Sequence, residues 1–151
     1  MLSKDKIASD STVTLRGTKF RALKDRYRAQ SLHELGSDLD PLSSNKVTGD
    51  SVNFPIAETC QPSKICANTC YGLSGPIVWK NSLNKQGRNY LACQTSPESF
   101  AERVIEKCSK KLAKDPKFFL RWNGVGDLFP ESITALKLIN AELPDLPIWC
   151  V

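Results

Sequence analysis

Histidine is almost missing from this 151-residue sequence, and long apolar runs are missing altogether. The only histidine is His33, so a Ser-His-Asp or Cys-His mechanism is not expected. No stretch approaches the ~20 apolar residues that cross a membrane, and the first residues contain no apolar run of signal-peptide length. We therefore expect a soluble, cytoplasmic protein that has no membrane partner.

Two common nucleotide-binding motifs and a disulfide framework are also missing. The chain has no GxxxxGK[ST] phosphate loop, and its nearest approach to GxGxxG has Phe129 at the third glycine position. Six cysteines make up about 4% of the sequence, below the roughly 8 to 10% of a disulfide scaffold. Cysteines stay reduced in the cytoplasm, so metal or cluster binding is favoured over disulfides.

Positive charge is concentrated at the N-terminus. Residues 1–30 contain eight Lys and Arg against three Asp, so they carry the whole net charge of +5. This asymmetry predicts a basic arm and linker over residues 1–50, attached to a neutral body over residues 51–151. A solvated face is the alternative; otherwise the arm binds nucleic acid or an acidic protein surface. The candidate contact residues are Arg16, Lys19, Arg21, Lys24, Arg26 and Arg28.

The body alternates between strand and helix patterns. Apolar spacing also predicts a short helix from Lys19 in the arm, and Gly, Ser, Asp and Pro at residues 36–52 predict a loop or linker. Ser96 followed by Pro97 predicts the start of the clearest helix. The elements expected after the linker are an extended run at 52–58, helices at about 77–92 and at 96–114, a strand at 117–122, a glycine loop at 123–129, a helix at 130–143 and a strand at 146–151. This order is typical of an α/β fold with a parallel sheet.

Half of the cysteines lie within eleven positions of the stretch TCQPSKICANTCYG: Cys60, Cys66 and Cys70. A structural zinc site usually has four ligands in CxxC-like pairs, which this spacing does not match. Cys108 and Cys150 fit better as core thiols than as a fourth ligand. Three thiolates match a [4Fe–4S] cluster with one open iron, while zinc, plain thiols or a disulfide remain alternatives.

A second candidate site is the sequence Gly124-Val125-Gly126-Asp127. It follows a predicted strand and precedes a predicted helix. Glycines at this position allow a ligand to approach the backbone, and the carboxylate of Asp127 accepts hydrogen bonds from a ligand amine. The alternative is a glycine-rich turn in which Asp127 serves only as a cap.

The cysteine stretch, the GVGDLF loop and the final PIWCV strand together resemble the phage protein family called gene product 88. That family in turn is similar to the radical S-adenosylmethionine enzymes. The resemblance covers about residues 53–151. It implies that Cys60, Cys66 and Cys70 hold a [4Fe–4S] cluster. It also implies that Gly124, Gly126 and Asp127 contact S-adenosylmethionine, which the open iron chelates before one electron cleaves the sulfonium.

The length of the chain adds a further expectation about the fold. It supplies about half of the strands of a closed barrel, so the resemblance implies a partial, open parallel sheet with flanking helices, like a truncated radical-enzyme barrel. The open sheet edge must be paired, covered or charged. The chain is then a fragment, a subunit that pairs through this edge, or a shortened relative.

Two other functions remain open at this point. A shortened relative from a phage or mobile genetic element would suit a non-catalytic antagonist of a host defence or nucleoprotein complex, in the manner of an anti-CRISPR protein. The other alternative is a zinc-stabilised nucleic-acid-binding module.

Overall fold

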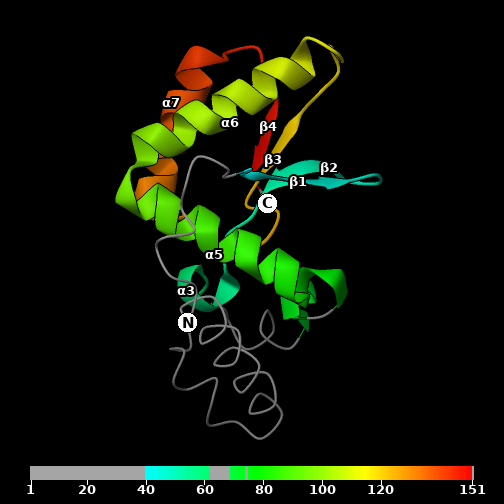
Figure 1. Cartoon of the computed structure of the whole chain (residues 1–151), viewed down its shortest axis with the longest axis vertical. Helices are drawn as coiled ribbons and strands as arrows, with labels where there is room; N and C mark the ends of the chain where they lie inside the picture. The colour runs from blue at the N-terminus through cyan, green and yellow to red at the C-terminus, as the bar shows by residue number, and fades with distance from the viewer. Residues whose placement is uncertain (1–39, 62–68, 74, 151) are drawn as a thin grey trace, which may run out of the picture.

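The computed structural model describes residues 40–61, 69–73 and 75–150, and these residues form a mixed α/β fold around a four-stranded open sheet (Figure 1). The elements are β1 (Leu42–Asn45), β2 (Gly49–Val52), α3 (Ile56–Thr59), the short 3-10 helices η2 (Tyr71–Leu73) and η3 (Gly75–Val78), α5 (Lys80–Thr95), α6 (Pro97–Leu112), β3 (Leu120–Trp122), α7 (Pro130–Glu142) and β4 (Ile148–Cys150). The predicted arm helix and all six basic candidates lie outside the described residues, as does Cys66.

Local signals in the sequence correctly located helix α6. Ser96 is its N-cap and its Oγ accepts a hydrogen bond from the backbone N of Ser99 at 3.2 Å, while Pro97 occupies the first turn. Lys110 and Lys111 lie in the last turn, where positive charge is favourable beside the exposed carbonyl groups. The predictions of α7 and of strands β3 and β4 are also confirmed, within a few residues at each end.

The strands lie in the order β1-β2-β3-β4. Strands β2, β3 and β4 are parallel, as predicted, whereas β1 pairs antiparallel with β2. The β1–β2 hairpin falls within the segment expected to be a loop or linker, so this part of the expectation was wrong. Its turn is held by Asn45, whose Oδ1 accepts hydrogen bonds from the backbone N of Val47 at 2.8 Å and of Thr48 at 3.2 Å.

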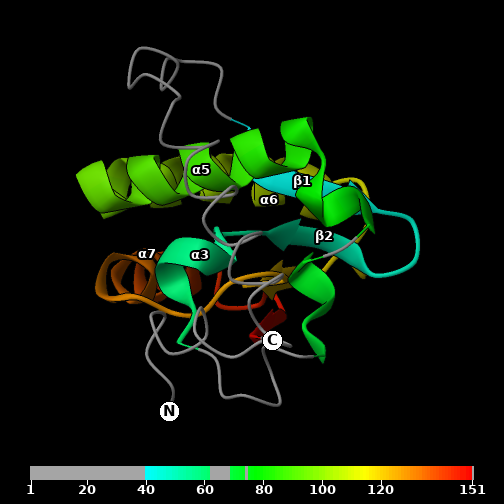
Figure 2. The same cartoon turned by 90° about the horizontal axis from the view of Figure 1, so that it is seen from below.

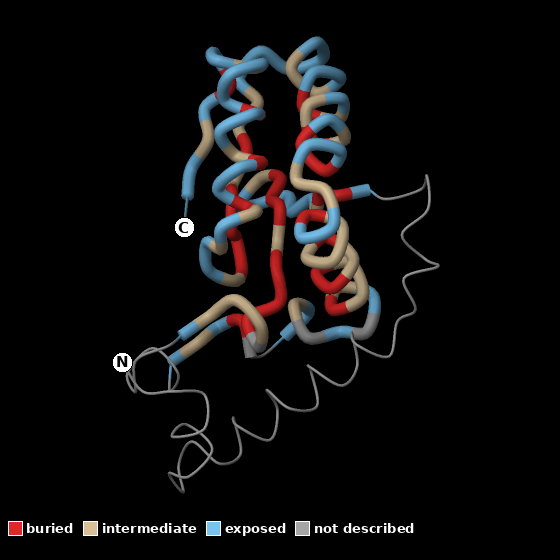
Figure 3. The backbone as a smooth tube through the Cα atoms, turned by 90° about the vertical axis from the view of Figure 1, so that its left-hand side faces the viewer, coloured by how far each residue is buried: buried red, intermediate tan, exposed pale blue. Residues whose placement is uncertain are grey.

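The hydrophobic core lies between one face of the sheet and the three long helices. Leu42, Val52 and Trp122 are cross-strand neighbours on this face, and all three are buried in the main core cluster. Phe100, Val104 and Cys108 of α6 and Ala135 and Ile139 of α7 cover them. Figure 3 shows the buried residues concentrated on the inner sides of these elements. Burial on a helical face confirms the prediction that Cys108 is a core thiol.

The opposite face of the sheet has a different composition. Side chains alternate between the two faces of a strand, so the residues between the core positions face away from α6 and α7. The residues that form this row, one from each strand, are Ser43, Ser51, Arg121 and Trp149. We call this side of the sheet the open face.

Strand β4 is one edge of the sheet, and in the described part of the chain it pairs only with β3. Cys150 is exposed on this strand, so the prediction that it is a core thiol was wrong. An edge strand has a neighbour on one side only, and alternation alone does not reveal that. Pairing of chains through this edge stays a prediction. No helix in the described ranges is long and apolar enough to cross a membrane.

Candidate ligand site at the carboxyl ends of β2 and β3

The loop that contains Gly124, Gly126 and Asp127 follows β3 and lies against the segments on both sides of the cysteine stretch. On the β2 side, the backbone N of Phe54 donates to the carbonyl O of Val125 at 3.0 Å. The backbone N of Asp127 donates to Thr59 Oγ1 at 3.0 Å, next to Cys60. After the cysteine stretch, the Tyr71 hydroxyl donates to the carbonyl O of Gly124. The two sequence motifs therefore meet at the carboxyl ends of adjacent parallel strands, where open α/β sheets bind ligands.

The two glycines of the loop lie in close contact with β2 and the residues after it: Gly124 with side chains, and Gly126 with the backbone of Phe54 and the side chain of Thr59. Gly126 has φ +90°, and a Cβ there would lie 2.6 Å from the carbonyl O of Phe54 and 2.8 Å from Thr59 Oγ1. A Cβ on Gly124 would lie 2.6 Å from Asn53 Oδ1. Real Cβ atoms are not found so close to other atoms, so only glycine lets this loop pack on β2. The Asp127 side chain is exposed, so its carboxylate is accessible to a ligand.

Cys60 and Cys70 are both half-buried and lie beside the same small apolar cluster. This cluster is formed by Ile56, Leu83 and Val125, and both cysteines pack against it. Its Val125 belongs to the glycine loop. The structure therefore brings two of the three predicted ligands to one place beside the predicted cofactor loop. Thiolates are soft ligands of the kind that iron–sulfur clusters use, and two of the three predicted ligands lie at this place.

The electrostatics of Tyr71 link these groups further. Burial raises the pKa of its phenol; the positive charge of Arg121 opposes this shift, and negative charge on Cys70 and Cys60 adds to it. The phenol is thus close enough to sense both thiols and the guanidinium. Tyr71 connects the third cysteine, the glycine loop and the open face of the sheet.

The remaining cysteines are separate from this site. Burial is the main cause that raises the pKa values of Cys93 and Cys108 to about 12, so both stay protonated thiols at neutral pH. Cys150 is exposed on β4. Within residues 40–61, 69–73 and 75–150, no three His, Cys, Asp or Glu side chains are grouped to hold a metal. Because Cys66 is not among these residues, convergence of all three cysteines stays a prediction.

Two asparagines at the same strand ends are features that the sequence analysis missed. Asn53 follows β2 and Asn123 follows β3. Asn123 is only 2% exposed, has φ 58°, and neither polar atom of its side chain has a hydrogen-bond partner in the described structure. Asn53 Oδ1 is likewise buried without a partner. Buried polar groups without partners are uncommon and often belong to binding sites. The sequence signal for Asn123 is its position directly before the glycine loop; Asn53, which precedes Phe54, has no such signal.

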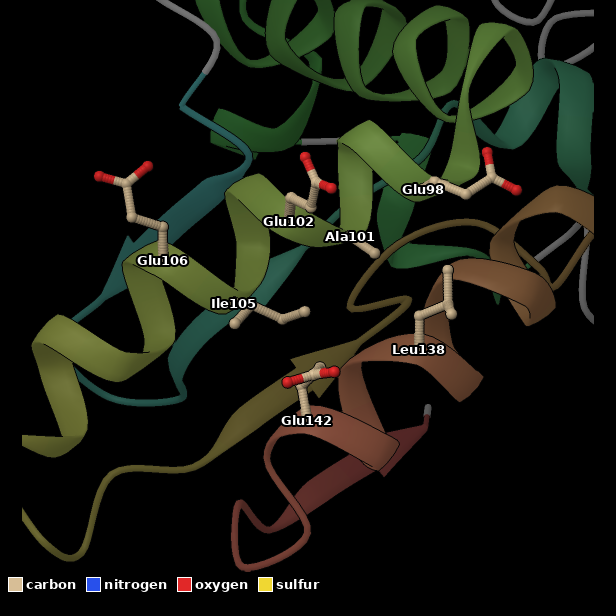
Figure 4. A pocket seen from close by; sticks show the side chains of 7 residues that line it. All are labelled: Glu98, Ala101, Glu102, Ile105, Glu106, Leu138 and Glu142. Carbon is tan, nitrogen blue, oxygen red and sulfur yellow. The ribbon is translucent and has the colours of Figure 1, made fainter.

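A separate groove lies between α6 and α7 (Figure 4). Apolar side chains of Ala101, Ile105 and Leu138 line it together with four glutamates. The acidic lining residues are Glu98, Glu102, Glu106 and Glu142. None of these residues belongs to the cysteine stretch or the glycine loop, so the groove is not part of the candidate site.

Comparison with protein families decides the family of this chain. The family described as gene product 88 matches residues 18–150, which is most of the sequence. The chain belongs to the gene product 88 family. Gene product 88 proteins are phage proteins, so a phage origin is supported. Comparisons with curated proteins and with solved structures found no match.

Membership of the gene product 88 family confirms the resemblance to that family, and the match also includes residues 18–50 of the predicted arm and linker. The likeness of the family to radical S-adenosylmethionine enzymes stays a prediction. Of the predicted site residues, the structure brings together Cys60, Cys70 and the loop of Gly124, Gly126 and Asp127. Figure 2 views the molecule from the end that carries α3, the short helix that directly precedes Cys60.

Proposed function

We propose that this gene product 88 protein is a phage protein of the radical S-adenosylmethionine type. In this proposal Cys60, Cys66 and Cys70 hold a [4Fe–4S] cluster, and the loop of Gly124, Gly126 and Asp127 binds S-adenosylmethionine. The fold is then a shortened, open form of the barrel that such enzymes have. Two alternative functions would replace this proposal if it fails. One is antagonism of a host nucleoprotein complex, and the other is a zinc-stabilised nucleic-acid-binding module.

One observation carries the proposal: the glycine loop is hydrogen-bonded to residues on both sides of the cysteine stretch, at the carboxyl ends of neighbouring parallel strands. A cluster and a cofactor that react with each other require neighbouring sites. The apolar cluster of Ile56, Leu83 and Val125 supports the same view, because both Cys60 and Cys70 pack against it and Val125 belongs to the glycine loop.

Each residue that we place in the proposed site has a defined task there. When bound, the cluster supplies the electron that cleaves the sulfonium of S-adenosylmethionine. The Asp127 carboxylate accepts hydrogen bonds from the amino group of that cofactor. Thr59 orients the loop, since its Oγ1 accepts from the backbone N of Asp127 and donates to the carbonyl O of Pro55 at 3.1 Å. Tyr71 fixes the other end of the loop at Gly124.

Iron content tests the cluster. Protein purified and reconstituted without oxygen is expected to contain about four irons and four sulfides per chain. Serine at any one of the three cysteines removes a thiolate ligand, so Cys60→Ser, Cys66→Ser and Cys70→Ser should each lose most of this iron. Iron and sulfide assays, together with the visible absorbance of the cluster, give the measurement.

The matched control is Cys150→Ser, which removes an exposed thiol outside the site and should keep the full iron content. Zinc in place of iron would favour the function of a zinc-stabilised nucleic-acid-binding module. Protein that folds but binds no metal would favour the antagonist. Equal iron in all four variants would exclude the three cysteines as ligands.

Asp127→Asn tests the cofactor loop. The substitution keeps the shape of the side chain but removes its charge, and a hydrogen bond to a charged group contributes about 1.5 to 3 kcal/mol. We expect the affinity for S-adenosylmethionine to fall about 10-fold to 100-fold while the iron content stays constant. Equilibrium dialysis with cluster-loaded protein measures this affinity, and Asp145→Asn, in the exposed turn before β4, is the control. Equal affinity in wild type and the Asp127 variant would remove this residue from the site.

A further inference from the structure

The open face of the sheet has the composition of a ligand-binding surface. Its central row contains Ser51, Arg121 and Trp149 on three adjacent parallel strands. Phe119 precedes Arg121 by two residues and lies on the same side: a Cβ on Gly49 would meet its ring at 2.9 Å. The guanidinium of Arg121 and the ring of Trp149 thus lie on adjacent strands, while Ser51 beside them is buried and its hydroxyl donates to the carbonyl O of Ser43 at 3.5 Å.

Arg121 is the unusual member of this row. Its side chain is half-buried in the middle of the sheet, yet no hydrogen-bond or ion-pair partner of its guanidinium occurs in the described structure. The only acidic residue of the four strands is Asp50, which faces the helices, where Lys111 Nζ lies 2.5 Å from its Oδ2. Within the part of the chain that the structure describes, no carboxylate pairs with this guanidinium, whose charge acts on the Tyr71 phenol; burying a charge is costly unless it is paired.

An aromatic surface lies beside this charge. The rings of Phe119 and Trp149 are in contact, with centroids 5.6 Å apart and an angle of 37° between their planes. Trp149 remains 65% exposed, so much of its indole is free to contact a ligand. Trp and Arg are enriched among the residues that anchor binding partners.

We propose that the open face binds a nucleotide, with the base stacked on Trp149 and the phosphate held by Arg121. Neighbouring strands are ~4.8 Å apart, so one mononucleotide reaches both Arg121 and Trp149. Arginine binds phosphate oxygens through a planar pair of N–H groups, and stacking on aromatic rings accommodates any base. This binding goes beyond the proposed cluster chemistry and requires neither a cluster nor S-adenosylmethionine.

Titration of metal-free protein with AMP tests this site. The chain has three tryptophans, Trp79, Trp122 and Trp149, so three indole N–H signals are available in nitrogen-15 NMR spectra. The Trp149 signal is expected to move on titration, whereas that of the buried Trp122 should stay in place. Arg121→Gln is expected to weaken AMP binding at least 10-fold and Trp149→Leu several-fold, because stacking contributes ~1–3 kcal/mol per base.

Lys137→Gln, which removes an exposed charge on α7, is the control and should bind AMP as wild type does. Unchanged backbone spectra confirm that each variant is folded. Adenosine and inorganic phosphate should each bind at least 10-fold more weakly than AMP. If a single-stranded oligonucleotide binds more tightly per nucleotide than AMP, with strong salt dependence, the natural ligand is a nucleic-acid strand. If the two bind equally, the natural ligand is a free nucleotide. The proposal is overturned if AMP and the oligonucleotide leave the Trp149 signal in place, or if Arg121→Gln binds as wild type does.

Discussion

Replacing Phe54 by Ala is expected to lower the free energy of unfolding by about 3–5 kcal/mol, a large part of the stability of a domain of this size. Phe54 is fully buried and lies at the centre of an aromatic group. Its ring centroid is 4.9 Å from that of Phe129, 5.8 Å from that of Trp122 and 6.0 Å from that of Phe100. The truncation leaves a cavity between the sheet and two helices, and three aromatic contacts are lost with it.

Urea denaturation followed by circular dichroism measures this loss. Phe54→Leu keeps much of the apolar volume and should cost clearly less, while Val47→Ala, at a 91% exposed turn position, should change the stability by less than about 0.5 kcal/mol. A loss for Phe54→Ala as small as that for Val47→Ala would mean that the core is not built around this ring.

Gly126→Ala is the second substitution with a large expected effect. The residue has φ +90°, which an L side chain rarely adopts, and its new Cβ would lie within 2.8 Å of Phe54 O and Thr59 Oγ1. The first contact is to backbone, so the loop itself must move. We expect a loss of about 2–4 kcal/mol from the combination of strain and overpacking. The hydrogen bond from the backbone N of Asp127 to Thr59 should be lost as well.

Gly75→Ala separates strain from clash. Gly75 has a similar positive φ of +68°, but a Cβ there would meet nothing within 4 Å. This control should therefore cost only the conformational strain, about 1–2 kcal/mol. Thermal or urea unfolding of both variants gives the difference, and S-adenosylmethionine binding should be lost only in the Gly126 variant. Equal losses of stability would show that the close packing of the loop on β2 contributes nothing.

Local patterns were sufficient for helices α6 and α7, whereas α3 (Ile56–Thr59) lies in the stretch that was predicted to be extended, so that prediction was wrong. Ser96 and Pro97 predicted the start of α6, and the apolar face of that helix placed Cys108 in the core. Such features depend on residues within a few positions of one another, so a sequence displays them directly. The family resemblance likewise depended on short motifs, and it correctly identified the gene product 88 family.

The hairpin was not predicted because its strands are short and polar. Leu42–Asn45 reads LSSN and Gly49–Val52 reads GDSV, so the apolar alternation that marks a strand is almost absent. Their pairing depends on a turn at Asn45 and on the packing of Leu42 and Val52 against distant helices. The exposure of Cys150 was missed for a related reason: the position of a strand within a sheet depends on which strands pair, and not on its own sequence.

By itself, the sequence determined the alternation of strands and helices, the α6 cap and the two motifs of the candidate site, because these depend on neighbouring residues. Only the tertiary structure decided that Tyr71 and Thr59 bind the glycine loop from the two sides of the cysteine stretch. The same holds for the row of Ser51, Arg121 and Trp149, whose members are up to 98 positions apart in the chain. Strand register brings such residues together, and register is set by burial of one whole sheet face against the helices, which no local pattern encodes.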